Sequence, residues 1–481
     1  MDSFIPVEKI QALIFGSGKG SGNCSVTGSA NGSEEPPRRD VEALIAKGRA
    51  CEGLDLDEAS LLLRCNDREL IEELFRAARE VKESIYGRRL VLFAPLYISN
   101  SCVNDCLYCG FRKENATLQR RILTTDEIRG EAAALLAEGH KRVLLVAAED
   151  PRQVGIEAIE KAIAAVYAAG RGNGDGIRRV NVNVAPLTVE EYRRLKAAGI
   201  GTYQLFQETY FPPVYKKMHP RGPKADYDGR LLALGRAQEA GIDDVGMGCL
   251  FGLYDYRFEV LALIAHARHL EERFGVGPHT ISVPRVEPAS HAPLSERPPA
   301  GVDDEAFKKV VALLRLAVPY TGLILSTREK AGFRDELLHL GVSQISAHSN
   351  TAPGGYTEGA RGRGNGEGQF ALGDRRTTAE VISDISAKGF TPSFCTACYR
   401  VGRTGEAFME HAKPGHIHRF CQPNALLTFK EYLLDFGDDS LRAVGEGLIR
   451  EELSAMDDGK VERATRKKLR ELERGKRDIY F

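Results

Sequence analysis

The residues best suited to chemistry are six cysteines that fall into two sets of three. Their spacings are Cys102-x3-Cys106-x2-Cys109 and Cys395-x2-Cys398-x22-Cys421. A 4Fe-4S cluster that only carries electrons is held by four protein thiolates, so three thiolates leave one iron open to an outside ligand. The spacing therefore predicts two clusters, each with one iron available for chemistry.

For both sets zinc is the alternative to an iron-sulfur cluster, because short Cys-x2-Cys pairs are common in zinc sites. Zinc needs four nitrogen or sulfur ligands, and the segment from Cys102 to Cys109 offers no fourth ligand at the usual spacing. Around the second set, three histidines could complete a Cys3His site: His411, His416 and His418. The first set therefore favours iron, and the second stays open between a cluster and zinc.

The composition sets limits on the class of protein. With 481 residues, 43% of them hydrophobic, the chain can bury one barrel-sized domain with additions. The formal net charge is -1 and the charges are interspersed, which argues against nucleic acid and anionic membranes as partners. No apolar run is long enough to span a bilayer. Ten cysteines without a secretion signal suit a reducing compartment, so we expect a soluble, cytoplasmic protein.

Three domains are expected: residues 1–89, a helical N-terminal extension; residues 90–390, a barrel; and residues 391–481, a mostly helical tail with the second cysteine set. Within the extension, residues 16–39 are rich in Gly and Ser and predict a flexible insertion. Residues 40–86 show apolar positions at helical spacing. Residues 351–368 are rich in glycine and predict a surface loop.

A recurring junction indicates repeated βα units between residues 90 and 390. Each predicted helix ends at a glycine that accepts the left-handed C-cap conformation, and a predicted strand follows within a few residues. These glycines are Gly139, Gly199, Gly241, Gly341 and Gly389. The predicted strands cover residues 90–97, 142–148, 178–184, 202–207, 244–250, 279–285, 321–326 and 344–348. Eight strands with interleaved helices predict an α/β fold of the parallel (β/α)8 TIM-barrel type, with an open doubly wound sheet as the alternative.

In such a barrel the active site lies at the carboxyl ends of the strands, so the loop with the first cysteine set faces the mouth. The pattern C-x3-C-x-aromatic-C, with Tyr108 before the last cysteine, resembles the signature of radical S-adenosylmethionine (SAM) enzymes. In that superfamily the amino and carboxylate groups of SAM chelate the open iron. The resemblance therefore implies a 4Fe-4S cluster that binds SAM.

Longer segments resemble the HydG family of FeFe-hydrogenase maturases. They include LFAPLYISNSCVNDCLYCGF, YKKMHPRGPKADYD and LGVSQISA in the barrel, and CTACYRVGRTGEAFM and FCQPNALLTFKEYLLDF in the tail. The resemblance extends from about Leu44 to Phe436, apart from insertions. A related tyrosine lyase of thiamine biosynthesis, 2-iminoacetate synthase, shares the barrel and the first cysteine set but lacks the second. The tail set therefore favours the maturase.

The resemblance implies a complete reaction. An electron from a donor such as ferredoxin or flavodoxin cleaves SAM, and the resulting radical takes hydrogen from L-tyrosine, which splits into p-cresol and dehydroglycine. Dehydroglycine gives carbon monoxide and cyanide, which a labile iron at an auxiliary 4Fe-4S cluster captures for assembly of the hydrogenase H-cluster. Other hydrogenase maturation proteins would then be partners. The alternatives are an aromatic amino acid lyase of another pathway and a non-catalytic iron-sulfur scaffold.

Residues for SAM are expected at two strand ends. Ala147, Ala148 and Glu149 occupy the place of the Gly-Gly-Glu motif of the radical enzymes, which binds the methionine ammonium group. Alanine in place of both glycines predicts a less close approach of the backbone. Gln207 and Glu208 end the fourth strand and are candidates for the ribose hydroxyls, with a structural role at the strand end as the alternative.

The carboxylate of tyrosine needs a cation at the mouth. Arg328, just after the seventh strand, is placed for a bidentate pair, and Arg285 at the end of the sixth strand is the alternate. His279 begins the sixth strand, so it lies at the opposite rim, where it could ligate the labile iron. His348 is a rival for that role, at a position where the family usually has glycine.

Overall fold

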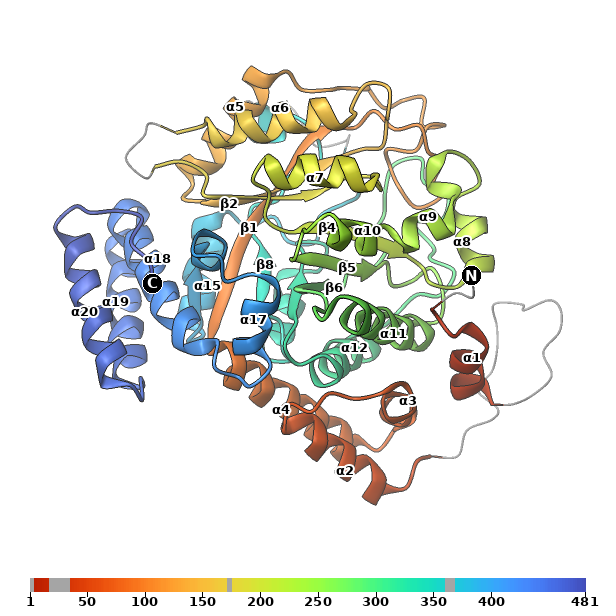
Figure 1. The fold of residues 1–481 in the computed structure, drawn as a ribbon, viewed down its shortest axis with the longest axis horizontal. Helices are drawn as coiled ribbons and strands as arrows, with labels where there is room; N and C mark the ends of the chain where they lie inside the picture. Colours follow the sequence, from red (N-terminus) through yellow and green to blue (C-terminus); the bar gives the residue numbers. More distant parts are fainter. Residues whose placement is uncertain (1–3, 17–34, 171–174, 360–367) are drawn as a thin grey trace.

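The structure is a computed structural model that describes residues 4–16, 35–170, 175–359 and 368–481. The predicted insertion at 16–39 lies mostly outside these residues. Parallel strands form a closed ring at the centre of the molecule (Figure 1). The strands are β1 (Arg89–Ser99), β2 (Arg142–Ala147), β3 (Arg179–Asn183), β4 (Tyr203–Glu208), β5 (Val245–Cys249), β6 (Thr280–Ser282), β7 (Gly322–Leu325) and β8 (Gln344–Ser346).

The sheet closes because β1 pairs with β2 on one side and with β8 on the other. Closure confirms the predicted (β/α)8 barrel and shows that the open doubly wound sheet was wrong. Strand β6 is shorter than the predicted 279–285. Pro284 follows it and has no N–H to offer the ladder, and beyond it Arg285 forms an isolated bridge with Phe251, which lies just after β5.

Helices cover the outside of the barrel. They are α5 (Thr125–Ala137), α6 (Ile156–Tyr167), α7 (Val189–Ala197), α8 (Pro212–Met218), α9 (Tyr227–Leu231), α10 (Ala233–Glu239), α11 (Tyr256–Phe274), α12 (Asp304–Ala317), α13 (Ala331–Leu338), α14 (Gly355–Gly359) and α15 (Thr378–Ala387), with a 3-10 turn at Pro223–Ala225. Three of them begin at a Thr that forms a capping box with a Glu three residues later: Thr124, Thr188 and Thr377. The capping residue satisfies N–H groups that the first turn leaves without a partner.

The N-terminal extension is helical, with α1 (Val7–Phe15), α2 (Arg38–Arg49), α3 (Leu56–Arg64) and α4 (Arg68–Tyr86). Helix α4 packs on α12, and α1 packs on α11 (Figure 1). Lys309 of α12 ties the extension to the barrel, since its ammonium group donates to the carbonyl oxygens of Leu63 (2.8 Å) and Cys65 (2.5 Å).

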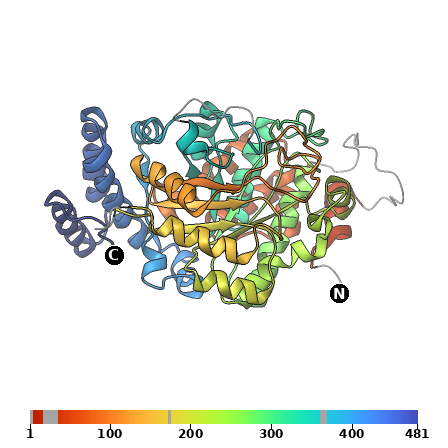
Figure 2. The same cartoon turned by 90° about the horizontal axis from the view of Figure 1, so that it is seen from above.

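The tail joins the barrel through a short strand after Gly389, where the recurring junction predicts a strand, although the eight predicted barrel strands do not include it. Strand β9 (Thr391–Ser393) pairs in parallel with the first residues of β1. Helices α16 (Ala397–Arg400), α17 (Gly405–Ala412), α18 (His418–Phe436), α19 (Asp439–Ser454) and α20 (Gly459–Glu473) follow. Figure 2 shows α18 to α20 at one end of the molecule and α1 at the other. Among the described helices, none has the length and apolar character needed to cross a bilayer.

The loop predicted over 351–368 differs from the expectation in its described part. Thr351 and Gly355 are buried, and the backbone N–H groups of Tyr356 (3.0 Å) and Thr357 (2.7 Å) donate to the carboxylate of Glu131. Residues 360–367 lie outside the described part of the chain. The start of this segment is therefore packed against α5, because a buried carboxylate satisfies the N–H groups at the beginning of α14.

Gly139 offers a test of how the tail packs on the barrel. Its φ is +91°, and an added Cβ would meet the ring of Tyr432 in α18 at 2.5 Å. Gly199 has a similar φ of +79° but open space around it. We expect Gly199→Ala to cost about 1–2 kcal/mol through the left-handed backbone. Gly139→Ala should cost about 1–3 kcal/mol more, because the ring must move. Thermal unfolding of both variants measures the difference, and equal losses would contradict this packing.

Candidate active site

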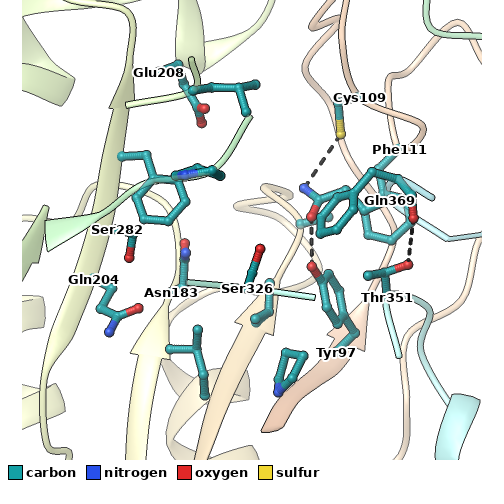
Figure 3. Close-up of a pocket in the computed structure, with 18 of the residues that line it drawn as sticks. Tyr97, Cys109, Phe111, Asn183, Gln204, Glu208, Ser282, Ser326, Thr351 and Gln369 are labelled. Atoms are coloured by element: carbon teal, nitrogen blue, oxygen red, sulfur yellow. Dashed lines mark hydrogen bonds between the residues drawn. The ribbon is translucent and has the colours of Figure 1, made fainter. Parts of the chain in front are cut away.

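The carboxyl ends of the strands surround a cavity of about 200 Å³. Figure 3 shows side chains from several strands pointing into it, with Glu208 on one side and Gln369 on the other. The cavity is lined by all three cysteines of the first set, by Ala147, Ala148 and Glu149, and by Tyr108, Glu208 and Arg328. The predicted residues for the cluster, for SAM and for the substrate carboxylate therefore meet in one place, except for Gln207 and Arg285.

The loop with the first cysteine set is held by buried charge. Arg112 donates to the carboxylate of Asp105 at 2.7 Å, and both side chains are buried. Arg120 donates to the carbonyl oxygens of Asn100 (2.9 Å) and Phe111 (2.7 Å), at the two ends of the loop. These contacts fix the loop without any contribution from the cysteines, which leaves the sulfur atoms available as ligands.

The surroundings of the sulfur atoms are compatible with a bound metal centre. Burial raises the pKa of Cys106 to about 12 and also raises that of Cys109, so a bound cation would be needed to keep them as thiolates at pH 7. Amide groups donate to two of the sulfurs, from Asn104 to Cys102 (3.8 Å) and from Gln369 to Cys109 (3.7 Å). An iron-sulfur cluster keeps its thiolate ligands deprotonated, and hydrogen bonds to the sulfurs tune its potential. The three side chains therefore fit the cluster that the sequence predicts.

Gln369 links Tyr97 of β1 to Cys109 in the loop of the first cysteine set. Its amide oxygen accepts a hydrogen bond from the hydroxyl of Tyr97 at 2.8 Å, which fixes the orientation of the amide and aims its N–H at Cys109 (Figure 3). No motif marked Gln369 in the sequence, because it follows the glycine-rich segment and reaches the cavity only through the fold.

Glu149, just after β2, forms hydrogen bonds with the loop of the first cysteine set. The backbone carbonyl of Glu149 accepts from the N–H of Val103 at 2.9 Å, and its carboxylate accepts from the side chain of Asn104 at 2.7 Å. Ala147 and Ala148 line the cavity beside it. Their position next to the cysteine loop suits the role proposed for this segment in binding SAM, which stays a prediction.

Of Gln207 and Glu208 at the end of β4, Glu208 lines the cavity. Glu208 sits at a bulge with φ of +70°, and its buried carboxylate pairs with Lys224 (2.5 Å) and Arg230 (3.4 Å). Burial alone would raise the pKa of Glu208, but the two cations hold it below its ordinary value. Gln207 does not line the cavity, and its amide donates to the carbonyl of Tyr227 at 3.4 Å. Gln207 therefore has the structural contact that the sequence left as the alternative.

The two candidate arginines have different surroundings. Arg328 lines the cavity with its guanidinium 3.3 Å from the ring centroid of Phe370. No carboxylate in the described chain lies within ion-pair distance of it. Arg285 points away from the cavity and pairs with Glu329 and with Asp304 (2.8 Å). Arg328 is thus the cation that remains available to a substrate carboxylate.

A second, smaller pocket of about 50 Å³ lies at the opposite end of the barrel, and we call it the floor pocket. It is lined by Cys395, Cys398 and Cys421 together with His279. Burial lowers the pKa of His279, so its ring is neutral at pH 7 and able to ligate a metal. His348 lies elsewhere, where its ring pairs with Glu138. Among the two histidines considered for the labile iron, only His279 is beside the tail cysteines.

The zinc alternative for the tail has little support in this geometry. Within the described residues, no three Cys, His, Asp or Glu side chains come together closely enough for a single metal ion. None of His411, His416 and His418 lines the floor pocket. Zinc requires four ligands at about 2.0–2.3 Å from one centre, whereas a cluster spreads its thiolates around a larger group.

Sequence reasoning missed the residues that surround the candidates. Lys224 lies in the YKKMHPRGPKADYD segment but had no assigned role, and it reaches Glu208 across the cavity wall. Asn104 sits between two cysteines, and its side chain contacts both Cys102 and Glu149. Its place inside the cysteine motif was the available signal, but the contact with Glu149 required the fold.

Two family models match consecutive parts of the chain. A model of the radical SAM superfamily matches residues 96–265, and a model of the biotin and thiamin synthesis associated domain matches residues 282–391. The chain is 31% identical over 340 residues to 2-iminoacetate synthase of Escherichia coli (strain K12), covering 70% of this chain and 86% of that protein.

Two solved structures cover nearly the whole chain. The crystal structure of HydG, a maturase of the [FeFe]-hydrogenase, has a TM-score of 0.90 and 48% identity, and covers 99% of this chain and 100% of its own. The X-ray structure of HydG from Carboxydothermus hydrogenoformans has a TM-score of 0.78 and 45% identity, and covers 90% of this chain and 94% of its own. The first of these alignments covers the tail as well, whereas the synthase comparison covers 70% of this chain.

Iron content tests the ligand assignment for both cysteine sets. After anaerobic reconstitution we expect about eight or nine irons per chain, because each cluster holds four. Cys395→Ser/Cys398→Ser should retain about four irons, since the first set is intact. Cys51→Ser is the matched control and should keep the full content, because Cys51 lies in neither pocket. About four irons and one zinc in the unmodified protein would contradict a tail cluster.

Proposed function

The chain belongs to the HydG family of [FeFe]-hydrogenase maturases within the radical SAM superfamily, and from that premise we propose that it cleaves L-tyrosine and captures the resulting diatomic fragments on iron. The products would be p-cresol and dehydroglycine, and the latter would supply carbon monoxide and cyanide for the hydrogenase H-cluster. The observation that carries this proposal is the presence of two three-cysteine sets at opposite ends of one closed barrel.

When bound, the first cluster supplies the electron that splits SAM and so provides the radical that takes hydrogen from tyrosine. The residues of the chain position the reactants. Cys102, Cys106 and Cys109 would hold the cluster, and the segment at Glu149 lies next to their loop, where it would receive the methionine ammonium group. Glu208 would accept hydrogen bonds from the ribose hydroxyls of SAM, because Lys224 already holds its carboxylate in place.

Arg328 would bind the carboxylate of tyrosine. Its guanidinium stacks on Phe370, so its plane is fixed while its edge remains available for a bidentate pair. The strand ends hold the substrate inside a cavity whose walls exclude water, which strengthens this charge pair and protects the reactive fragments.

The second cluster would bind to Cys395, Cys398 and Cys421, with His279 as a ligand of a labile iron. The closed barrel lies between this floor pocket and the cavity, so the small products can be used within the same molecule. The electron would come from a ferredoxin or flavodoxin type donor, and other hydrogenase maturation proteins would receive the iron product.

A second candidate activity is that of the thiamine pathway, because 2-iminoacetate synthase is among the relatives. That activity needs the barrel and the first cluster alone. It would make p-cresol but no metal-bound diatomic ligands, so the two candidates differ in a measurable product.

Arg328 provides a test of substrate binding. Arg328→Gln should raise the KM for tyrosine about tenfold to a hundredfold, because a hydrogen bond to a charged group contributes about 1.5–3 kcal/mol. Cleavage of SAM without tyrosine should change little. Arg285→Gln is the control: it breaks the pair with Glu329 and should lower thermal stability more than it raises KM. A raised KM in the Arg285 variant alone would move the carboxylate site to Arg285.

The separate role of the tail is tested by its products. The reconstituted protein should convert tyrosine and SAM to p-cresol, measured by chromatography, and give infrared bands of metal-bound carbon monoxide and cyanide. Cys395→Ser/Cys398→Ser should lose the infrared bands while keeping much of the p-cresol, because the first cluster is untouched. Cys51→Ser should retain both signals. An unmodified protein that makes p-cresol without these bands would favour the thiamine-type activity.

A further inference from the structure

Three arginines, two of them buried and one half-buried, lie side by side at the floor of the barrel. Arg89, Arg142 and Arg179 are the first residues of β1, β2 and β3, which are neighbouring strands. Arg142 and Arg179 are direct partners in the parallel register. Arg89 and Arg142 line the floor pocket with the tail cysteines, whereas Arg179 does not.

None of the three has a carboxylate within ion-pair distance in the described chain. The Nε atoms of Arg89 and Arg142 and one terminal nitrogen of Arg179 are buried without a hydrogen-bond partner. The contacts that are present are neutral: Arg142 donates to the carbonyl of Cys395 at 3.2 Å, and Arg179 donates to the side chain of Asn181 at 3.3 Å. Each of the three guanidinium groups therefore has at least one buried nitrogen without a hydrogen-bond acceptor.

Such an arrangement is costly unless a negative group occupies the pocket. Leaving a buried charge without a compensating partner is strongly destabilising. In the described chain Asp244 is the carboxylate that lies within ion-pair distance of the floor pocket's lining, 3.7 Å from the ring of His279. One carboxylate cannot balance three guanidinium groups. The three tail cysteines share the pocket with Arg89 and Arg142, so a negatively charged centre bound to them would supply the missing charge.

The tail sulfurs act unequally on the three arginines. Burial would lower the pKa of Arg89, but Cys421, Tyr86 and the other two tail cysteines raise it above its ordinary value. Burial lowers the pKa of Arg142 in spite of the nearby Tyr399 and Cys395. Arg179 instead lies with its guanidinium 2.9 Å from the ring centroid of Tyr399, which stands between it and the pocket.

We propose that Arg89 and Arg142 are the fixed countercharge of the tail iron-sulfur centre and raise its reduction potential, whereas Arg179, which stacks on Tyr399 and does not line the pocket, contributes less. This inference rests on the proposed tail cluster. A positive charge in a buried, poorly screened site stabilises the reduced cluster, which carries one more negative charge, over the oxidised one. The same charge favours thiolates over thiols at the three cysteines. Arg89 and Arg142 therefore act through the cluster and need not touch any substrate.

The test is a redox titration of the reconstituted full-length protein, followed by electron paramagnetic resonance of each cluster. In Arg142→Gln, the ratio of reduced to oxidised tail cluster at a fixed potential should fall at least tenfold, a shift of about 59 mV for one electron. Arg89→Gln should shift the tail cluster in the same direction. Arg142→Lys keeps the charge and should restore most of the potential.

Two control measurements separate an effect of charge from a general change in the structure. Arg179→Gln removes a buried arginine from the adjoining strand and should shift the tail potential clearly less than Arg142→Gln does. The first cluster, at the other end of the barrel, should keep its potential in every variant. Equal shifts in the Arg142 and Arg179 variants, or no shift in either, would overturn the proposal.

Loss of the tail cluster is also informative. If Arg142→Gln loads four irons while Arg142→Lys loads eight, the charge is required to hold the thiolates, and the proposal is supported. If both variants lose the cluster, the guanidinium shape is what matters and the proposal fails. If the unmodified protein itself holds only the first cluster, the proposed function fails at the tail, which is a different outcome from an unshifted potential.

Discussion

The structure depends on the hydrogen bonding of β1. This strand pairs with β2 and β8 to close the barrel, and its first residues also pair with β9 to attach the tail. It runs from Arg89 to Ser99, about 33 Å at 3.3 Å per residue. One of its ends leads into the loop of Cys102, and the other carries Arg89 in the floor pocket. The spacing between the two cysteine sets is therefore built into a single strand that three neighbours hold.

The two ends of the barrel have different electrostatic character. At the mouth, carboxylates and cations line the cavity together, and Glu208 pairs with Lys224. At the floor, Arg89 and Arg142 lack carboxylate partners and face cysteines. A paired, ionised carboxylate suits polar groups of a cosubstrate, whereas an excess of positive charge suits a negatively charged metal centre. The fold thus separates the two kinds of chemistry by strand direction.

Containment follows from the same closure. In the proposed reaction a radical forms at one end and small diatomic products are used at the other. A closed ring of hydrogen-bonded strands has no open edge facing the interior, and the helices outside cover its walls. Water and other solutes then reach the reactive groups only through the ends, where the cysteine loop and the tail sit. The substrate arginine, Arg328, lies at the end where the substrate would enter.

The sequence by itself determined the two cysteine sets, the repeated βα units and the family. These signals are local, because ligand spacing and C-cap glycines depend on residues only a few positions apart. The sequence also placed residues correctly by strand end, since a parallel barrel puts all carboxyl ends on one face. That rule is enough to bring Glu149, Glu208 and Arg328 to the mouth and His279 to the floor.

Tertiary structure decided what strand position could not. Gln207 and Arg285 stand at the predicted strand ends, yet one turns to Tyr227 and the other to Glu329, because a side chain's direction depends on the partners that the fold brings near. Strand β9 is three residues long, too short for a periodic signal. It forms because β1 pairs with β2 only from Ala94 onward, which leaves that edge of its first residues free, on the side opposite β8. The countercharge of Arg89 and Arg142 was equally hidden. They are about fifty residues apart in sequence and join the tail cysteines only when the barrel has closed, since the need for a buried cation to meet a negative group is a property of the folded interior.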